Sequence, residues 1–222
     1  KPLAITYFPF IFRDAEHQLA YAKSDVFKEL AKGYDDKTGN HITALNYYGA
    51  RHVTSSAAKP VSKPEDMKGL KIRVQQSDLW VSLVQAMGAN PTPIPMAEVY
   101  TALKTGLVDA AENNYPSYET AKHYEAAPIF SETEHVMLPE VLVFSKKTWD
   151  TLTKEEQKII REAAKETIPY YIDLWTKKEM ASKNITLKAG AKYNDVNKAE
   201  FVAAVKPVWD KFSPTPELKK LV

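Results

Sequence analysis

The segment Lys68–Asn114 constrains the fold of this chain more than any other part of the sequence. Residues 70–75 alternate apolar and polar side chains, the period of two that is typical of a strand. A helix is expected over residues 78–87, a second strand after it, a short helix over 96–104, and a buried strand over 107–111. Strands that alternate with helices in this way predict an α/β fold.

Polar side chains lie in or directly after two of these strands. Arg73 belongs to the first strand, and Glu112, Asn113 and Asn114 follow the last one. In open α/β sheets, ligands bind in the crevice beyond the carboxyl ends of the strands. We therefore expect Arg73 and Asn113 to face the same small molecule. The sequence places no catalytic group beside them, so it predicts a binding site.

The composition is that of a globular protein, with 44% hydrophobic and 26% charged residues. Its 222 residues can form one large domain or two lobes of about 100 residues each. A net charge of +2, without any cluster of four or more basic residues, argues against nucleic acid as a partner. Pro139 and Glu140 interrupt the longest apolar stretch, near residues 136–144, so we expect no membrane insertion. The absence of cysteine leaves the compartment undecided.

The remaining elements continue the alternation of strands and helices. The ranges expected as strands are the start of residues 3–12, then 41–48, 136–144 and 185–188, and those expected as helices are 15–32, 62–69 and 198–212. The longest helix begins at a capping box, Thr153 to Glu156, and carries an apolar stripe for more than five turns. Pro169 lies inside it, so we expect a kink there. The abrupt start of the chain indicates that earlier elements of the fold are missing.

No motif in the sequence indicates an enzyme, a metal or a cofactor. The five histidines show neither HExxH nor HxH spacing, which argues against a zinc site. A GxSxG elbow, a GxGxxG loop and a P-loop are all lacking. The acidic pairs at 35–36 and 155–156 are better explained as solvated turns or helix-dipole partners than as paired catalytic carboxylates.

Four segments resemble a known family in order and spacing: YYGARHVTSS, KPEDMKGLKIRV, GANPTPIPMAEVYTALKTGLVDAAENN and TEHVMLPEVLVFSKKTWDTLTKEEQKIIREAAKE. They are similar to the DctP-like solute-binding proteins of tripartite ATP-independent periplasmic (TRAP) transporters. This resemblance implies a periplasmic, monomeric protein that closes around an organic acid and presents it to a membrane permease. It also implies mixed sheets in two lobes, residues 1–48 with 139–180 and residues 49–138 with 181–222, linked by the long kinked helix.

The resemblance also suggests ligand-binding residues. Arg73 matches the arginine that clamps the carboxylate of the solute, and a planar guanidinium suits that role. Arg51 matches a second arginine, although it could instead form an ion pair between the lobes. Asn113 matches a ligand asparagine, although Ala110 and Ala111 precede Glu112 where Gly and Gln are common. The further candidates are Asn114, Met96 as an apolar wall and His135 at the border of the site; a turn, a core or a buried structural role is the alternative for each.

The segments ENNYPSYETAKHYE and TEHVMLPEVLVFSKK resemble the branch that binds sugar acids, hexuronates among them. A C4-dicarboxylate or another organic acid is an alternative solute. Two other classes of protein stay open at this point: a ligand-sensing domain with the same fold, and an enzyme that acts on sugar acids.

Overall fold

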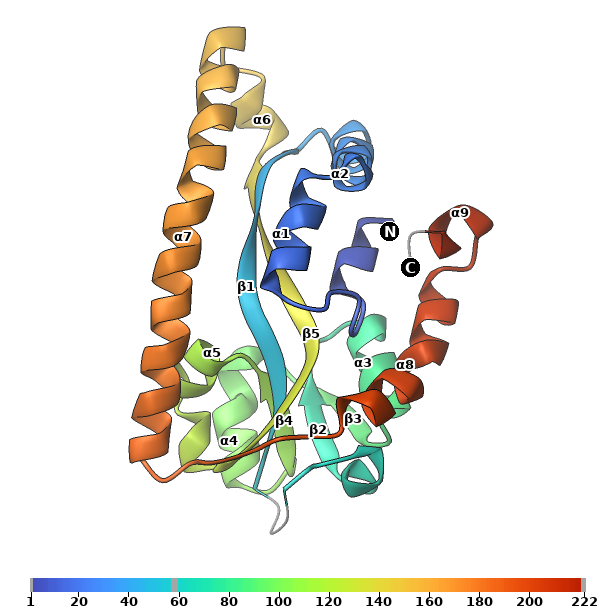
Figure 1. The fold of residues 1–222 in the computed structure, drawn as a ribbon, viewed down its shortest axis with the longest axis vertical. Helices are drawn as coiled ribbons and strands as arrows, with labels where there is room; N and C mark the ends of the chain where they lie inside the picture. Colours follow the sequence, from blue (N-terminus) through green and yellow to red (C-terminus); the bar gives the residue numbers. More distant parts are fainter. Residues whose placement is uncertain (1, 57–59, 221–222) are drawn as a thin grey trace.

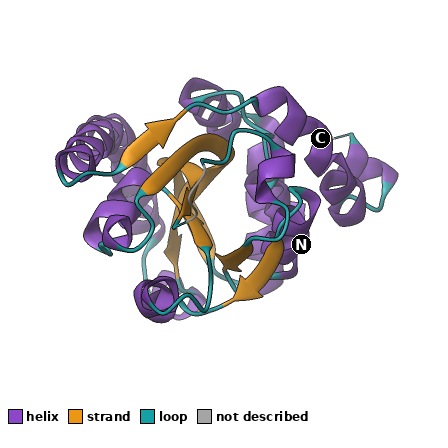
Figure 2. Ribbon diagram, turned by 90° about the horizontal axis from the view of Figure 1, so that it is seen from below, coloured by secondary structure: helices purple, strands orange, loops and turns teal. Residues whose placement is uncertain are grey.

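The computed structural model describes residues 2–56 and 60–220 of the chain. Its centre is a mixed six-stranded sheet with the strand order β3-β2-β4-β1-β5-β6 (Figure 1). Helices lie around this sheet when it is viewed from one end (Figure 2). The predicted α/β class is therefore confirmed.

The two longest strands, β1 (His41–Ser55) and β5 (Ile129–Phe144), are antiparallel neighbours at the centre of the molecule. They pair from His41 opposite Phe144 to Ser55 opposite Ile129, which makes a ribbon that runs through most of the structure (Figure 1). Their register shifts at three places, one of which lies between Tyr47 and Ala50. Such irregularities bend and twist a strand pair locally.

The remaining strands are short and widen one end of this ribbon into a sheet. On one side, β4 (Ala110–Asn113) runs antiparallel to β1, and β2 (Lys71–Val74) and β3 (Asn90–Pro93) follow it in parallel. On the other side, β6 (Lys192–Asn194) runs parallel to β5. Because β2 and β4 are parallel neighbours, Arg73 and Asn113 come to the same edge of the sheet, as the sequence predicts.

Helix α7 (Lys154–Lys188) runs along the β1–β5 ribbon (Figure 1). The predicted capping box is present, since Thr153 accepts a hydrogen bond from the amide of Glu156, and the Glu156 carboxylate accepts one from Thr153. The helix is continuous through Pro169, and the kink expected there stays a prediction. The other helices are α1 (Ala15–Lys23), α2 (Asp25–Thr38), α3 (Asp78–Ala86), α4 (Val99–Lys104), α5 (Tyr115–Thr120), α6 (Lys146–Trp149), α8 (Lys198–Phe212) and α9 (Pro216–Lys219), with 3-10 turns η1 (Pro2–Tyr7), η2 (Pro64–Met67), η3 (Met96–Glu98) and η4 (His123–Glu125).

The largest apolar core lies at the wide end of the ribbon, between the sheet and helices α3 and α8. Ile72, Leu83, Met87, Phe201 and Val205 are among its almost fully buried members. Smaller clusters form under α4 and around α1 and α2. The strand that carries Arg73 is thus anchored on its apolar side by the main core.

Several expected elements differ from the structure. The described residues begin with the 3-10 turn η1 and not with a strand, and Ile5 in this turn and Phe8 directly after it pack onto the main core. The helix expected over 15–32 is interrupted at Ser24, whose side chain caps α2. The strand expected over 185–188 is the last turn of α7, and the strand expected over 107–111 begins three residues later.

Candidate functional site

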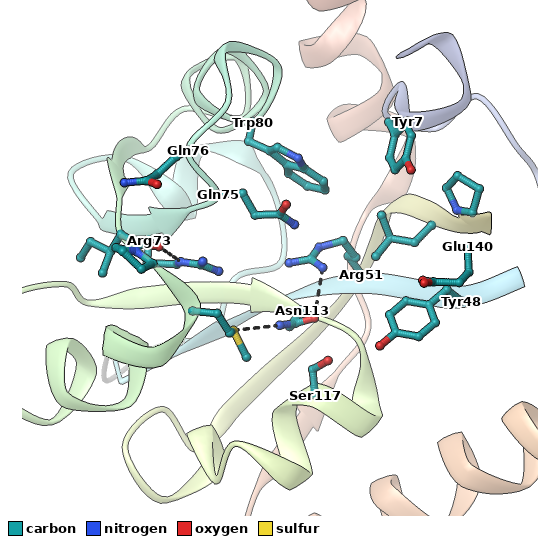
Figure 3. Close-up of a pocket in the computed structure, with 15 residues that line it drawn as sticks. Tyr7, Tyr48, Arg51, Arg73, Gln75, Gln76, Trp80, Asn113, Ser117 and Glu140 are labelled. Atoms are coloured by element: carbon teal, nitrogen blue, oxygen red, sulfur yellow. Dashed lines mark hydrogen bonds between the residues drawn. The ribbon is translucent and has the colours of Figure 1, made fainter. Parts of the chain in front are cut away.

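A cavity of about 500 Å³ opens at the edge of the sheet where β2 and β4 end (Figure 3). Its walls come from the two halves of the β1–β5 ribbon, which meet at the register shift between Tyr47 and Ala50, from the loop after β3 and from helices α3 and α5. The lining residues are Tyr7, Tyr48, Arg51, Arg73, Gln75, Gln76, Trp80, Ile94, Pro95, Met96, Asn113, Ser117, Leu138, Pro139 and Glu140. Two arginines, three amides and several hydroxyls together give the cavity a polar, hydrogen-bonding lining.

Arg73 offers an unused guanidinium edge to this cavity. The residue is only 4% exposed, and its Nε donates to the carbonyl of Ile94 at 2.7 Å. The two terminal nitrogens form no hydrogen bond or ion pair with any described residue. Burial lowers the pKa of Arg73, Glu112 opposes that effect, and the nearby Arg51 charge adds to it. A buried cation without a counter-ion is the arrangement that an anionic ligand would complete.

Arg51, in contrast, has a resident partner. Its Nε and one terminal nitrogen donate to the two carboxylate oxygens of Glu112, the latter at 2.7 Å, and the same nitrogen also reaches the Glu112 carbonyl. Its other terminal nitrogen donates to Asn113 Oδ1 at 3.1 Å, and the ring of Trp80 lies 4.9 Å from its guanidinium carbon. The antiparallel pairing of β1 with β4 creates these contacts, because it sets His52 opposite Asn113 and Val53 opposite Glu112. Arg51 lines the cavity, but its charge is already compensated.

Glu112 is 1% exposed and depends on this network for its ionised form. Burial alone would raise its pKa, but the Arg51 charge and the hydrogen bonds from His135 and Arg51 outweigh burial and lower it. His135 Nδ1 lies 2.8 Å from Thr133 Oγ1, and its Nε2 lies 3.3 Å from Glu112. Since Thr133 Oγ1 also accepts the amide of Val53, a chain of hydrogen bonds leads from the backbone of β1 to the buried carboxylate.

Two further predicted residues line the cavity, Asn113 and Met96. Asn113 Oδ1 accepts hydrogen bonds from Arg51 and from the amide of Asn114, while its Nδ2 lies 3.9 Å from the sulfur of Met96. Met96 is 41% exposed, so it serves as a cavity wall and not as core filling. These contacts fix the Asn113 amide with its donor side toward the cavity.

The other two predicted residues, Asn114 and His135, do not line the cavity and are fully buried. Asn114 caps α5 by accepting the amide of Ser117 at 2.9 Å, and its Nδ2 donates to the carbonyl of Tyr48 at 3.0 Å. His135 contacts Glu112 on the side of the Arg51–Glu112 pair that is turned away from the cavity. Their positions favour structural roles over ligand contact, because their polar atoms already have protein partners.

The sequence analysis missed more than half of the lining. Gln75 and Gln76 follow β2 at the same edge as Arg73, so the rule that identified Arg73 could have found them. Trp80 is a buried member of the main core, and one side of it also lines the cavity beside Arg51. Tyr48 and Glu140 belong to the other half of the β1–β5 ribbon, and no local signal in the sequence connects them with Arg73.

Within residues 2–56 and 60–220, no group of three or more His, Asp or Glu side chains is arranged to hold a metal ion. None of the helices in these ranges has both the length and the apolar character that a membrane span needs.

Comparison with known proteins identifies the family. Residues 1–215 match the DctP family, described as bacterial extracellular solute-binding protein, family 7. The chain belongs to this family. A curated relative from Chromohalobacter salexigens, a solute-binding protein, is 39% identical over 218 residues, which are 96% of this chain and 64% of the relative.

Solved structures agree with this assignment. A TRAP periplasmic solute-binding protein from Bradyrhizobium, in complex with α/β-D-galacturonate, is 48% identical with a TM-score of 0.91. A second one, from Chromohalobacter salexigens with bound D-glucuronate, is 38% identical with a TM-score of 0.93. Each comparison covers 99% of this chain and 73% of the solved chain.

These findings confirm the resemblance to TRAP solute-binding proteins and the two-lobed fold that the family shares. The family consists of extracellular binding proteins and not of enzymes, which agrees with the sequence analysis. The chain spans less than two thirds of the length of the curated relative described above.

Proposed function

We propose that this protein captures a hexuronate in the cavity described above and delivers it, in the periplasm, to the membrane permease of a TRAP transporter. The observation that carries the proposal is the guanidinium edge of Arg73, which is unpaired within the described part of the chain. Its two terminal nitrogens face a ligand-sized cavity and have no partner among the described residues. A guanidinium edge of this kind donates two parallel hydrogen bonds to one carboxylate.

The rest of the cavity suits the hydroxylated body of a sugar acid. Gln75, Gln76 and Asn113 carry amides, which both donate and accept hydrogen bonds, as sugar hydroxyls require. Trp80 and Met96 add apolar surface for the face of a sugar ring. A volume of about 500 Å³ lies within the usual range for small-molecule sites. The galacturonate and glucuronate bound to the two similar solved structures support the same class of solute.

The proposed mechanism is closure of two lobes, residues 1–48 with 139–180 and residues 49–138 with 181–222. The register shift between Tyr47 and Ala50 supports a boundary there, because its partners on β5 are Pro139 and Met137. Gly49 adopts a φ of +83°, a conformation that other residues rarely take. A solute that contacts both lobes only when they are closed shifts the equilibrium toward the closed form. Such a carrier is expected to act as a monomer.

The test is calorimetry of the protein as encoded in full, with glucuronate and with glucose. We expect Arg73→Lys to weaken glucuronate binding about tenfold or more, because a charged hydrogen bond contributes ~1.5–3 kcal/mol and lysine has no two-donor fork. Arg73→Ala is expected to weaken it further, and the exposed Arg13→Lys serves as the matched control. If the parent binds glucose as well as glucuronate, or if Arg73→Lys binds glucuronate like the parent, the carboxylate clamp is refuted.

A further inference from the structure

Only two of the charged side chains that line the cavity lack an ionic partner among the described residues. Arg51 is compensated by Glu112, which leaves Arg73 and Glu140. Neither of these two takes part in an ion pair with a described residue. They lie at opposite ends of the cavity, with Arg51 and Asn113 between them (Figure 3). The cavity therefore has a cationic end and an anionic end.

Glu140 reaches the cavity from the half of β5 that lies beyond the register shift. It follows Pro139 and pairs with Asn46 on β1, while Arg51 lies on the other side of the shift. Its side chain is exposed to the cavity and accepts no hydrogen bond from a described residue. Partial burial raises the pKa of Glu140 and, with the Glu140 charge, that of neighbouring Tyr7. The carboxylate thus stands at the cavity wall with its oxygens available for a ligand.

We propose that Glu140 determines the charge class of the solute: it accepts hydrogen bonds from hydroxyl groups and repels a second carboxylate. Resting on the proposed function, this inference narrows the solute to a polyhydroxylated monoanion whose carboxylate binds Arg73. Two carboxylates a few ångströms apart repel each other strongly in a partly desolvated cleft. Screening by water and salt reduces this effect, so we expect a discrimination of about 10- to 100-fold between a monoanion and a dianion.

The experiment uses two open-chain acids that differ at one end only. Gluconate has a hydroxymethyl group where glucarate has a second carboxylate, so their affinity ratio isolates the charge at the far end of the cavity. Calorimetry would compare the parent with Glu140→Gln, which keeps the shape and a hydrogen-bond acceptor but removes the charge. Glu98→Gln is the control, because Glu98 is exposed in η3 and does not line the cavity.

The expected result is that Glu140→Gln strengthens glucarate binding at least tenfold relative to gluconate and glucuronate, whereas Glu98→Gln leaves the ratios unchanged. A parent that binds glucarate as tightly as glucuronate overturns the inference. So does a Glu140→Gln protein whose preference is unchanged or that still binds no glucarate. Failure of the proposed function has a different result, since the parent would then bind none of the three acids or would bind glucose equally well.

Discussion

The buried pair of Arg51 and Glu112 provides the sharpest test of the site's architecture. We expect Glu112→Gln to destabilise the fold, because it leaves the Arg51 guanidinium, only 3% exposed, without an anion. Removing one partner of a buried ion pair typically costs about 3–5 kcal/mol. The glutamine carbonyl can still accept one hydrogen bond from Arg51, which places the expected loss near the lower value, ~3 kcal/mol.

For a chain of this size, 1 kcal/mol corresponds to ~2–4 °C in Tm, so the melting temperature should fall by about 6–12 °C at pH 7. The difference in melting temperature between the parent and Glu112→Gln should become smaller in acid. The pKa of Glu112 is lower in the fold than its ordinary value of 4.5, so its contribution to stability is present above that value and is lost as the pH falls through the folded pKa. Glutamine has no such contribution to lose.

The assay is thermal unfolding of the unliganded protein between about pH 3 and about pH 8, a window that includes the ordinary pKa values of carboxylates. Glu29→Gln, an exposed change on α2, is the control and should melt like the parent. The double variant Arg51→Met/Glu112→Leu should recover much of the loss, because it removes both charges together. A Glu112→Gln protein that melts within about 2 °C of the parent at pH 7, less than 1 kcal/mol, would refute the role assigned to the pair.

Three other predictions concern α7 and the strand beside it. Burial raises the pKa of Glu179 to about 7, above its ordinary value of 4.5, so its ionisation lowers the stability of the fold as the pH rises between those values. In melts at about pH 4 and about pH 8, Glu179→Gln should be as stable as the parent in acid and more stable than the parent, by at most about 3 kcal/mol, in base. Gly49→Ala should destabilise by more than the ~1–3 kcal/mol of backbone strain, because its Cβ would lie 3.1 Å from the indole nitrogen of Trp175 and 3.3 Å from Cβ of the buried Asn114. Gly106→Ala, with open space around it, should show the strain alone in denaturant titrations. Pro169→Ala should change ligand-induced compaction in small-angle scattering more than it changes Tm, and equal compaction in parent and variant would contradict a hinge role.

Local signals predicted those elements whose ends are marked by specific side chains. The capping box at Thr153 and the amphipathic pattern of residues 198–212 gave correct starts for α7 and α8. The β-branched Ile185 and Thr186 suggested a strand, but Thr186 is fully buried and donates to the Ser182 carbonyl one helical turn earlier. Tertiary packing outweighs strand propensity there, and sequence alone does not contain that packing.

The site could be predicted only in part, for a related reason. Arg73 and Asn113 lie at the edge of a sheet whose parallel strands the sequence reveals. Asn114 is next to Asn113, but it turns away to cap α5, and His135 points into the network behind the cavity. Glu140 reaches the same cavity only because β1 pairs with β5 over its whole length, a contact between distant parts of the chain that no local pattern encodes.

The ribbon of β1 and β5 has a mechanical consequence for this site. Arg51 lies on one side of the register shift between Tyr47 and Ala50, and Glu140 lies on the other. In the closure proposed above, the two strands would rotate about this shift as a pivot, so a small rotation would change the spacing between Arg51 and Glu140. A substitution that stiffens the pivot would alter which molecules fit, even though it touches none of them.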